Sequence, residues 1–149
     1  NARAIEAHIR YAEEKGYPVW GISPCAVPGK HGVAYDEFGV NEIAAKGYGE
    51  KGVVTPHVSF LALSYKPDET LKNIRNFLEY YPDILGPYGF YDAVNVKNHK
   101  IAETYLCLDQ AMIFLSICNY LENDYVKRLF HASPNVKKVE KVLRIEAFF

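Results

Sequence analysis

Apolar residues recur at helical spacing in several separate segments of this chain. Near the start, Ile5 and Ile9 share one face among charged side chains, which predicts a helix over residues 2–15. Farther along, an apolar stripe begins after Pro67 and ends at Pro82, which predicts an amphipathic helix between the two prolines. The stripe is formed by Leu71, Ile74, Phe77, Leu78 and Tyr81.

Four more helices are predicted from capping residues and apolar content. Thr55 is an N-cap residue followed by a first-turn proline, and it predicts a helix through residue 64. Residues 102–122 are apolar on nearly all sides, which predicts a helix that is buried over most of its surface. Shorter helices are predicted over residues 123–131 and 133–145. Strand content is expected to be low.

Two long segments without helical periodicity separate these helices. Residues 17–54 are rich in glycine and proline, and a connection of that length is either functional or disordered. Aromatic residues such as Trp20 and Phe38 favour order. The second segment, residues 83–100, is predicted to be a loop with a short extended piece at residues 90–96.

The composition is that of a globular protein. Of the 149 residues, 49% are hydrophobic and 23% are charged, so we expect residues 1–149 to be a single domain or a fragment of one. The net charge is −1 and basic residues are interleaved with acidic ones, which gives no electrostatic case for binding nucleic acid. The longest apolar run, residues 105–120, is shorter than the roughly 20 residues that a membrane span needs.

The cysteines indicate neither a metal site nor a disulfide framework. Cys25, Cys107 and Cys118 are three in number and widely spaced, so they cannot all pair within the chain and lack the spacing of zinc ligands. We therefore expect no metal and no cofactor. The chain also opens directly in a helical pattern without a methionine of its own, which suggests a fragment.

The loop at residues 86–93 is the candidate functional centre. Two glycines and a proline restrict its backbone, and Asp92 stands near its far end. Three aromatic residues precede the acid: Tyr88, Phe90 and Tyr91. An acid beside flat apolar surfaces is what a sugar-binding cleft requires. The alternative is a turn carboxylate that bonds to its own backbone, and both interpretations of Asp92 stay open.

A second acid, Asp109, lies in the most apolar segment of the chain and is followed by Gln110. Burial would raise the pKa of Asp109, whereas a helix N-terminus favours its ionised form, so the direction of its shift stays open. Asp109 is a candidate base, a candidate acid, or a structural link between loops. His57 lies in the first turn of its predicted helix, where it is either a donor to a sugar hydroxyl or a packing residue.

Several short motifs occur in an order that resembles a known family. Besides the run Tyr-Gly-Phe-Tyr-Asp at residues 88–92, they are Trp20-Gly21-Ile22-Ser23, Val54-Thr55-Pro56, Leu108-Asp109-Gln110, Asn119-Tyr120 and Arg128-Leu129-Phe130. Together they resemble the C-terminal half of the glycoamylase-like family, over residues 17–143. That family includes the endo-β-1,2-glucanases and is similar to a domain of cyclic β-1,2-glucan synthases. The run at 88–92 is the most specific piece.

The resemblance implies an all-α fold that is part of an (α/α)6 toroid, about half of its helices, with long loops lining a cleft for a β-glucan, preferentially β-1,2-linked. It implies that Asp92 and Asp109 are catalytic acids of a glycoside hydrolase and that one of them assists the attacking water. Such enzymes need two carboxyls, about 5 to 5.5 Å apart for retention of configuration and about 6.5 to 9.5 Å for inversion. The substrate-binding residues that it implies are Trp20, His57, Tyr88, Phe90, Tyr91 and Gln110.

The resemblance also bears on partners and compartment. An oligo- or polysaccharide is the implied partner, together with a second copy of the chain or an absent N-terminal half that would hold the proton donor. A periplasmic or secreted location is favoured. The chain departs from the family pattern at Pro24-Cys25-Ala26, where an acid is usual, at residues 49–52, which lack Asp-Gly-Thr, and at Ala111-Met112, where Gly-Pro is common.

Two other kinds of function stay open on this basis. The chain is alternatively a non-catalytic helical module that binds carbohydrate or acts as a scaffold, which the missing acid at Pro24-Cys25-Ala26 favours. It is also compatible with a transglycosylase domain of a glucan synthase, in which a sugar instead of water accepts the glycosyl group.

Overall fold

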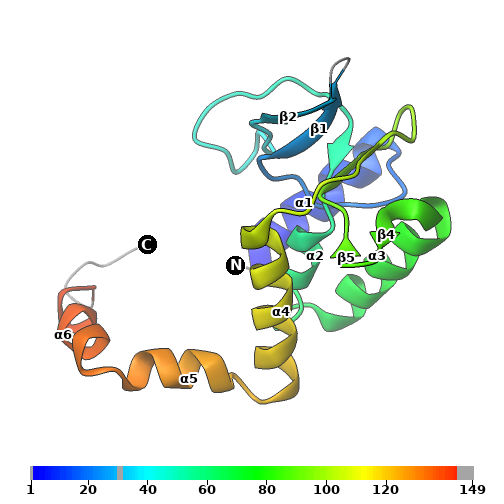
Figure 1. Ribbon diagram of the computed structural model, residues 1–149. Coiled ribbons are helices and arrows are strands. Elements are labelled where there is room, and N and C mark those ends of the chain that lie inside the picture. The colour runs from blue at the N-terminus through cyan, green and yellow to red at the C-terminus, as the bar shows by residue number, and fades with distance from the viewer. Residues whose placement is uncertain (1, 30–31, 144–149) are drawn as a thin grey trace.

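The computed structural model describes residues 2–29 and 32–143, in which helices alternate with short strands (Figure 1). The helices are α1 (Ala2–Lys15), α2 (His57–Leu61), α3 (Pro67–Tyr80), α4 (Cys107–Leu121), α5 (Tyr125–Ala132) and α6 (Pro134–Leu143), with a 3-10 turn at Pro82–Ile84. The strands are β1 (Cys25–Gly29), β2 (Gly32–Asp36), β3 (Val53–Val54), β4 (Leu85–Gly86), β5 (Gly89–Phe90), β6 (Ala93–Asn95) and β7 (Ile101–Ala102).

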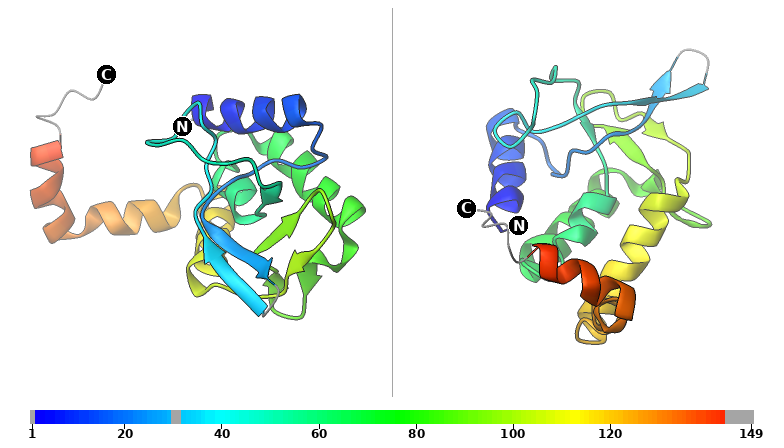
Figure 2. Two further views of the ribbon diagram at one scale, coloured as in Figure 1. Left: turned by 90° about the horizontal axis from the view of Figure 1, so that it is seen from above. Right: turned by 90° about the vertical axis from the view of Figure 1, so that its left-hand side faces the viewer.

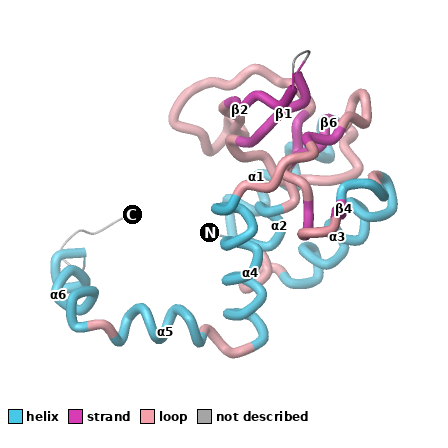
Figure 3. Tube along the Cα trace, viewed as in Figure 1, coloured by secondary structure: helices cyan, strands magenta, loops and turns pink. Residues whose placement is uncertain are grey.

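The strands form three small antiparallel sheets, so the all-α expectation is not confirmed. β1 pairs with β2, β4 pairs with β5, and the third sheet has the order β3-β6-β7. In this third sheet Val54 stands opposite Val94, and Ala93 stands opposite Ala102. Figure 3 shows β1, β2 and β6 together at the top of the view, above α2, α3 and α4. Part of the predicted long loops is therefore sheet.

The two helices predicted from amphipathic spacing are confirmed as α1 and α3. The burial within α3 differs from the predicted stripe, because Leu71 and Leu78 are exposed while Thr70 and Asn73 are buried beside Phe77. Polar side chains face inward here because they meet backbone groups of the preceding loop. Periodicity of apolar residues does not reveal such contacts.

The helix starts at residues 55 and 102 are corrected by the structure. Pro56 is the N-cap of α2, and Thr55 makes no capping bond there because its hydroxyl contacts His57. α4 begins only at Cys107, since the residues before it pair in β7. The prediction that this helix is buried on most of its surface is wrong, because Asp109 is the one residue of α4 that is buried.

The buried core lies where α3 meets the sheets. One cluster joins Phe77, Tyr81 and Ile84 of the α3 end to Val54 and Val94 of the third sheet. Outside this core, α5 and α6 lead away from the end of α4, as the left view in Figure 2 shows. Among the described residues no helix has both the length and the apolar character to cross a membrane.

Asn73 fastens α3 to the loop that follows α1. Its Oδ1 accepts a hydrogen bond of 3.0 Å from the backbone N of Trp20, and its Nδ2 donates to the Trp20 O and to the Ser59 Oγ, each at 2.8 Å. All of these groups are buried. The side-chain amide of Asn73 therefore pairs both the N–H and the C=O of Trp20. In a regular strand or helix, other backbone groups would be their partners.

We predict that Asn73→Ala lowers the free energy of unfolding by about 3 kcal/mol, because it leaves buried backbone groups of Trp20 without partners. Urea unfolding followed by circular dichroism measures the change. The control is Lys72→Ala on the exposed side of the same helix, where we expect a change within about 0.5 kcal/mol. Equal losses in the two variants would contradict the role of the Asn73 hydrogen bonds.

Candidate active site

Three predicted residues, His57, Asp92 and Asp109, meet in one buried cluster. His57 is the first residue of α2, Asp92 lies between β5 and β6, and Asp109 is in the first turn of α4. One nitrogen or oxygen atom from each lies within 4.8 Å of the others. The exposed fractions are 3% for His57, 3% for Asp92 and 5% for Asp109. The structure thus brings together two acids that the sequence places in separate motifs.

The backbone around Asp92 explains how it reaches this cluster. Its amide donates to the Thr104 O at 3.0 Å, and the next residue, Ala93, pairs with Ala102. The segment that leads into α4 therefore runs beside the loop that carries Asp92. The carboxylate accepts a hydrogen bond at Oδ2 from the backbone N of Ala26 in β1. Asp92 is thus not a turn carboxylate bonded to its own backbone.

Asp109 faces the imidazole of His57. The His57 Nδ1 lies 3.1 Å from the Asp109 Oδ2 and 2.7 Å from the Thr55 Oγ1. Thr55 is fully buried, and its backbone N donates to the Gly21 O at 2.9 Å. The motif at residues 20–23 and the motif at residues 54–56 therefore meet behind Asp109.

The two acids have pKa shifts of opposite direction. Burial raises the pKa of Asp92 to about 7, with a further contribution from its hydrogen bond with Asp109, while the Ala26 N opposes the shift. Burial also acts to raise the pKa of Asp109, but its hydrogen bonds with His57 and Asp92 outweigh that effect and lower it. The two shifts therefore favour the proton on Asp92 and the negative charge on Asp109.

The hairpin of β1 and β2 covers the acid pair. Burial raises the pKa of the Cys25 thiol, and the neighbouring carboxyls of Asp92 and Asp109 raise it further. Burial also raises the pKa of Tyr35, and the nearby carboxyls of Asp109 and then Asp92 raise it further. Both groups are therefore uncharged near neutral pH. No lysine or arginine in the described part of the chain forms an ion pair with either acid.

A group of tyrosines comes from the loop that carries Asp92 and from the segment just before α4. Tyr105 stands between Tyr88 and Tyr91, with ring centroids 5.6 Å from Tyr88 at 81° and 4.9 Å from Tyr91 at 33°. Tyr88 is 80% exposed. Gln110, beside Asp109, donates from Nε2 to the Phe90 O at 2.9 Å and so ties the loop at residues 86–93 to α4.

The other predicted aromatic residues are placed differently. Trp20 is 7% exposed and packs with Ile5, Ala12 and Ala62, so it is not among the tyrosines. Phe90 packs against Phe60 with centroids 5.6 Å apart and borders the core. The structure therefore offers exposed ring surface near the acids chiefly through Tyr88.

Residues that the sequence analysis missed at the site are Tyr105, Ala26 and the hydroxyl of Thr55. Tyr105 comes only four positions before Asp109, so an aromatic residue just upstream of the acid was an available signal. Ala26 contributes only its backbone N, and Thr55 was assigned to helix capping. Neither of these two roles has a signature in residue type or spacing.

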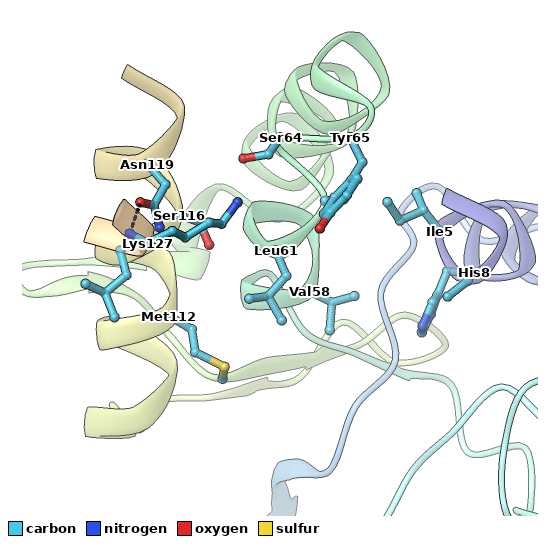
Figure 4. Close-up of a pocket in the computed structure, with 13 residues that line it drawn as sticks. Ile5, His8, Val58, Leu61, Ser64, Tyr65, Met112, Ser116, Asn119 and Lys127 are labelled. Carbon is cyan, nitrogen blue, oxygen red and sulfur yellow. Dashed lines mark hydrogen bonds between the residues drawn. The ribbon is translucent and has the colours of Figure 1, made fainter. Parts of the chain in front are cut away.

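A mainly apolar groove lies apart from the acids. It has a volume of about 510 Å³ and lies between α1, α2 and α4 (Figure 4). Its lining is mainly apolar, with Ile5, Val58, Leu61 and Met112 pointing toward it, and Lys127 at one side. Neither Asp92 nor Asp109 lines this groove.

His57, Asp92 and Asp109 are also the one described group whose donor atoms lie close enough to hold a cation together. A nitrogen and two carboxylate oxygens suit a borderline divalent ion such as Zn²⁺. A proton can bind the same carboxylate oxygens in place of a metal ion. Experiments on the protonation of Asp92 and Asp109 therefore need a chelator, which removes metal ions that would compete with the proton.

A buried pair of carboxyls with separated pKa values beside exposed aromatic rings is typical of enzymes that act on sugars. The chain matches the family model Glycoamylase, described as "Putative glucoamylase", over residues 1–134. It belongs to this family, which confirms the resemblance inferred from the motifs.

Two curated proteins and one solved structure illustrate the relationship. The chain is 29% identical over 159 residues to the cyclic β-(1,2)-glucan synthase NdvB of Rhizobium meliloti (strain 1021), covering 99% of this chain and 6% of that protein. It is 30% identical over 99 residues to an exo β-1,2-glucooligosaccharide sophorohydrolase (non-reducing end) of Parabacteroides distasonis, covering 65% of this chain and 14% of that protein.

The solved structure is an endo-β-1,2-glucanase from Chitinophaga pinensis in complex with sophorotriose and glucose. The two chains are 26% identical with a TM-score of 0.66, and the match covers 90% of this chain and 31% of the glucanase. The chain therefore spans less than a third of each of these three proteins. Its likeness to the glucanase is consistent with a fragment of the same fold.

We predict that Asp92→Asn is more stable than the wild type at pH 8, by roughly 1 to 3 kcal/mol. The pKa of an aspartate in the unfolded chain is about 3.9, whereas that of Asp92 in the folded chain is about 7. At pH values between these two, Asp92 keeps its proton in the folded chain and has lost it in the unfolded chain. Wild-type stability therefore falls as pH rises through this window. Asparagine stays neutral and removes the slope.

Urea unfolding at pH values from 4 to 8 in the presence of a chelator measures this effect. Asp83→Asn, at an exposed position, is the control and should keep the wild-type slope. The assignment of the proton to Asp92 is contradicted when Asp92→Asn shows the same pH slope as the wild type.

Proposed function

We propose that this chain forms part of the active site of a glycoside hydrolase acting on β-1,2-linked glucan. The observation that supports this most is the buried pair Asp92 and Asp109, whose pKa values are shifted in opposite directions, together with the exposed ring of Tyr88 on the loop that carries Asp92. The names of the relatives support the choice of substrate, because a synthase, a sophorohydrolase and a glucanase of β-1,2-glucan are all among them.

The separation of the acids limits how they act. One carboxylate oxygen of Asp92 and one of Asp109 lie within 4.8 Å of each other. Two carboxyls that flank a glycosidic bond stand about 5 to 5.5 Å apart in retaining enzymes and farther apart in inverting ones. We propose that Asp92 and Asp109 act as one unit on one side of the bond.

Within this unit the ionised Asp109 is the base. It takes a proton from the attacking water, or from an acceptor hydroxyl, as the new bond to the anomeric carbon forms. Asp92, whose pKa is raised, keeps its proton and so avoids a second negative charge next to the base. The acid that protonates the leaving oxygen then belongs to a part of the whole enzyme that this chain does not contain.

The tyrosines are proposed as the sugar platform. The exposed ring of Tyr88 is free to stack on a glucose ring, and Tyr105 supports it edge-on. Tyr91 and Gln110 hold the loop in place through Tyr105 and the Phe90 O. His57 contacts Thr55 and Asp109, and Trp20 packs with Ile5, Ala12 and Ala62, so we assign both to the support of the site.

A transglycosylase is the second candidate, because the match to the cyclic glucan synthase extends over 99% of this chain. Transfer to a sugar hydroxyl uses the same base and differs only in the acceptor. Mass spectrometry of the products separates the two reactions, since transfer yields chains longer than the substrate, or rings, and hydrolysis yields only shorter chains.

We predict that the chain binds linear β-1,2-gluco-oligosaccharides and that, in the whole enzyme, Asp109→Asn lowers turnover by at least about 100-fold without weakening binding, because a general base contributes that much. Calorimetry measures binding, and a reducing-end assay measures cleavage. Tyr88→Ala should weaken binding, whereas Tyr80→Ala on α3 serves as an exposed control. Absence of binding, or equal binding of β-1,3- and β-1,4-linked chains, would contradict the proposal.

We also propose that the chain associates with a second copy when no other partner is present. Large apolar side chains of α4, α5 and α6 are exposed, among them Phe114, Leu121, Leu129, Phe130 and Val139. Apolar patches of this extent mark interaction surfaces.

Light scattering should therefore give at least twice the mass of one chain. Replacing Leu129 and Phe130 together with serine should lower that mass, because it removes exposed apolar surface from α5. A monomer that melts cooperatively would contradict the proposed association.

A further inference from the structure

Tyr35 of β2 carries a large aromatic ring that the rest of the chain leaves open to solvent. The residue is 64% exposed, and its side chain makes neither a hydrogen bond nor a ring contact with another described residue. A single exposed aromatic residue is common on protein surfaces and needs no functional explanation by itself. Tyr35 differs from such a residue because of its position in the hairpin of β1 and β2.

The register of this hairpin places Tyr35 near the acid pair. Ala26 of β1 stands directly opposite Tyr35, so their Cα atoms are about 4.5 to 5.5 Å apart. The backbone N of Ala26 donates to the Asp92 Oδ2. In addition, the end of α4 that carries Asp109 points toward the hairpin (Figure 1). One strand spacing therefore separates Tyr35 from the residue that holds Asp92.

Residues that stand directly opposite each other project to the same face of a strand pair. On this face the side chain of Ala26 is buried, at 3% exposure, whereas the much larger side chain of Tyr35 extends to the solvent. The ring of Tyr35 thus lies where the covered part of the hairpin meets the surface. It is an exposed group beside two carboxyls that are themselves nearly inaccessible.

The electrostatic surroundings of the phenol agree with this placement. Burial raises the pKa of Tyr35, and the carboxyls raise it further, Asp109 more than Asp92. The hydroxyl therefore keeps its proton near neutral pH and stays able both to donate and to accept a hydrogen bond. The larger effect of Asp109 supports a position of the phenol on the Asp109 side of the pair.

The backbone that carries Tyr35 is held in place although its side chain is free. The next residue, Asp36, forms an ion pair with Lys51 and stands opposite Cys25 in the hairpin. Phe38, three positions after Tyr35, is buried in the same core cluster as Cys25. A free ring on a fixed backbone is a preorganised surface, which lowers the entropic cost of binding a ligand.

We propose that Tyr35 is a substrate-contact residue that packs its exposed ring against the glucose unit next to Asp109 and hydrogen-bonds through its hydroxyl to that sugar. This inference rests on the proposed function, in which Asp109 is the base. It adds a contact from the β1–β2 hairpin to the one proposed for Tyr88 in the loop at residues 86–93. A phenol suits this role because it combines a flat apolar face with a polar end.

The affinity for sophorotriose, a β-1,2-linked trisaccharide, tests the two parts of this contact. Tyr35→Phe keeps the ring and removes one hydrogen bond, so calorimetry on the full chain should show binding that is about 2- to 10-fold weaker. Tyr35→Ala removes the ring as well and should weaken binding by at least about 10-fold. Tyr80→Ala on α3 removes a ring that is 50% exposed and should leave the affinity within about twofold of the wild type.

NMR separates a direct contact from an indirect effect of the substitution on the hairpin. The wild-type chain is labelled with ¹³C in its tyrosine rings, and the Tyr35 signal is assigned by its loss in Tyr35→Phe. The inference expects nuclear Overhauser effects between sophorotriose protons and the Tyr35 ring, and none with the Tyr80 ring. This measurement needs only the wild type and Tyr35→Phe, so it decides the question even when Tyr35→Ala does not fold.

The possible results distinguish this inference from the proposed function. Wild-type binding without Overhauser effects to Tyr35, or an unchanged affinity in a folded Tyr35→Ala, would overturn the role of Tyr35 and leave the proposed function standing. A wild-type chain that does not bind sophorotriose would overturn both. Circular dichroism checks that each variant is folded.

Discussion

Two carboxyl groups buried side by side impose the constraint on which the rest of this structure depends. Two adjacent charges in a buried site would be costly, and no lysine or arginine of the described residues pairs with either one. Burial raises the pKa of Asp92, which favours a proton on that carboxyl. The imidazole of His57 lies 3.1 Å from the carboxylate of Asp109, the member whose pKa is lowered. β1, the β5–β6 link, α2 and α4 each contribute to this arrangement.

The same constraint limits the chemistry available to the chain. In the proposed function, two carboxyls with oxygens within 4.8 Å of each other act on one side of the glycosidic bond. The chain spans less than a third of the relatives with which it was compared, which leaves room for the opposing acid elsewhere in the whole protein. The exposed apolar sides of α4 to α6 are compatible with a large covering partner.

Much of the candidate site could be predicted from sequence, because Asp92, Asp109 and the tyrosine loop carry chemistry that residue type alone displays. The helices with clear amphipathic spacing, α1 and α3, were also predictable. The burial of α4 could not be predicted, because a sequence that is apolar on all sides of a helix does not show which side the rest of the chain covers. The contact of His57 with Asp109 could not be predicted either, since it depends on the long-range packing of α2 on α4.

A double-mutant cycle tests the central claim, that Asp92 and Asp109 form one proton-sharing unit, most directly. The free energy of unfolding is measured at pH 8, with a chelator, for the wild type, Asp92→Asn, Asp109→Asn and the double variant. The account predicts that the two single effects fail to add by at least about 1 kcal/mol, because each carboxyl sets the ionisation of the other. Effects that add to within about 0.5 kcal/mol would show two independent acids and contradict the account.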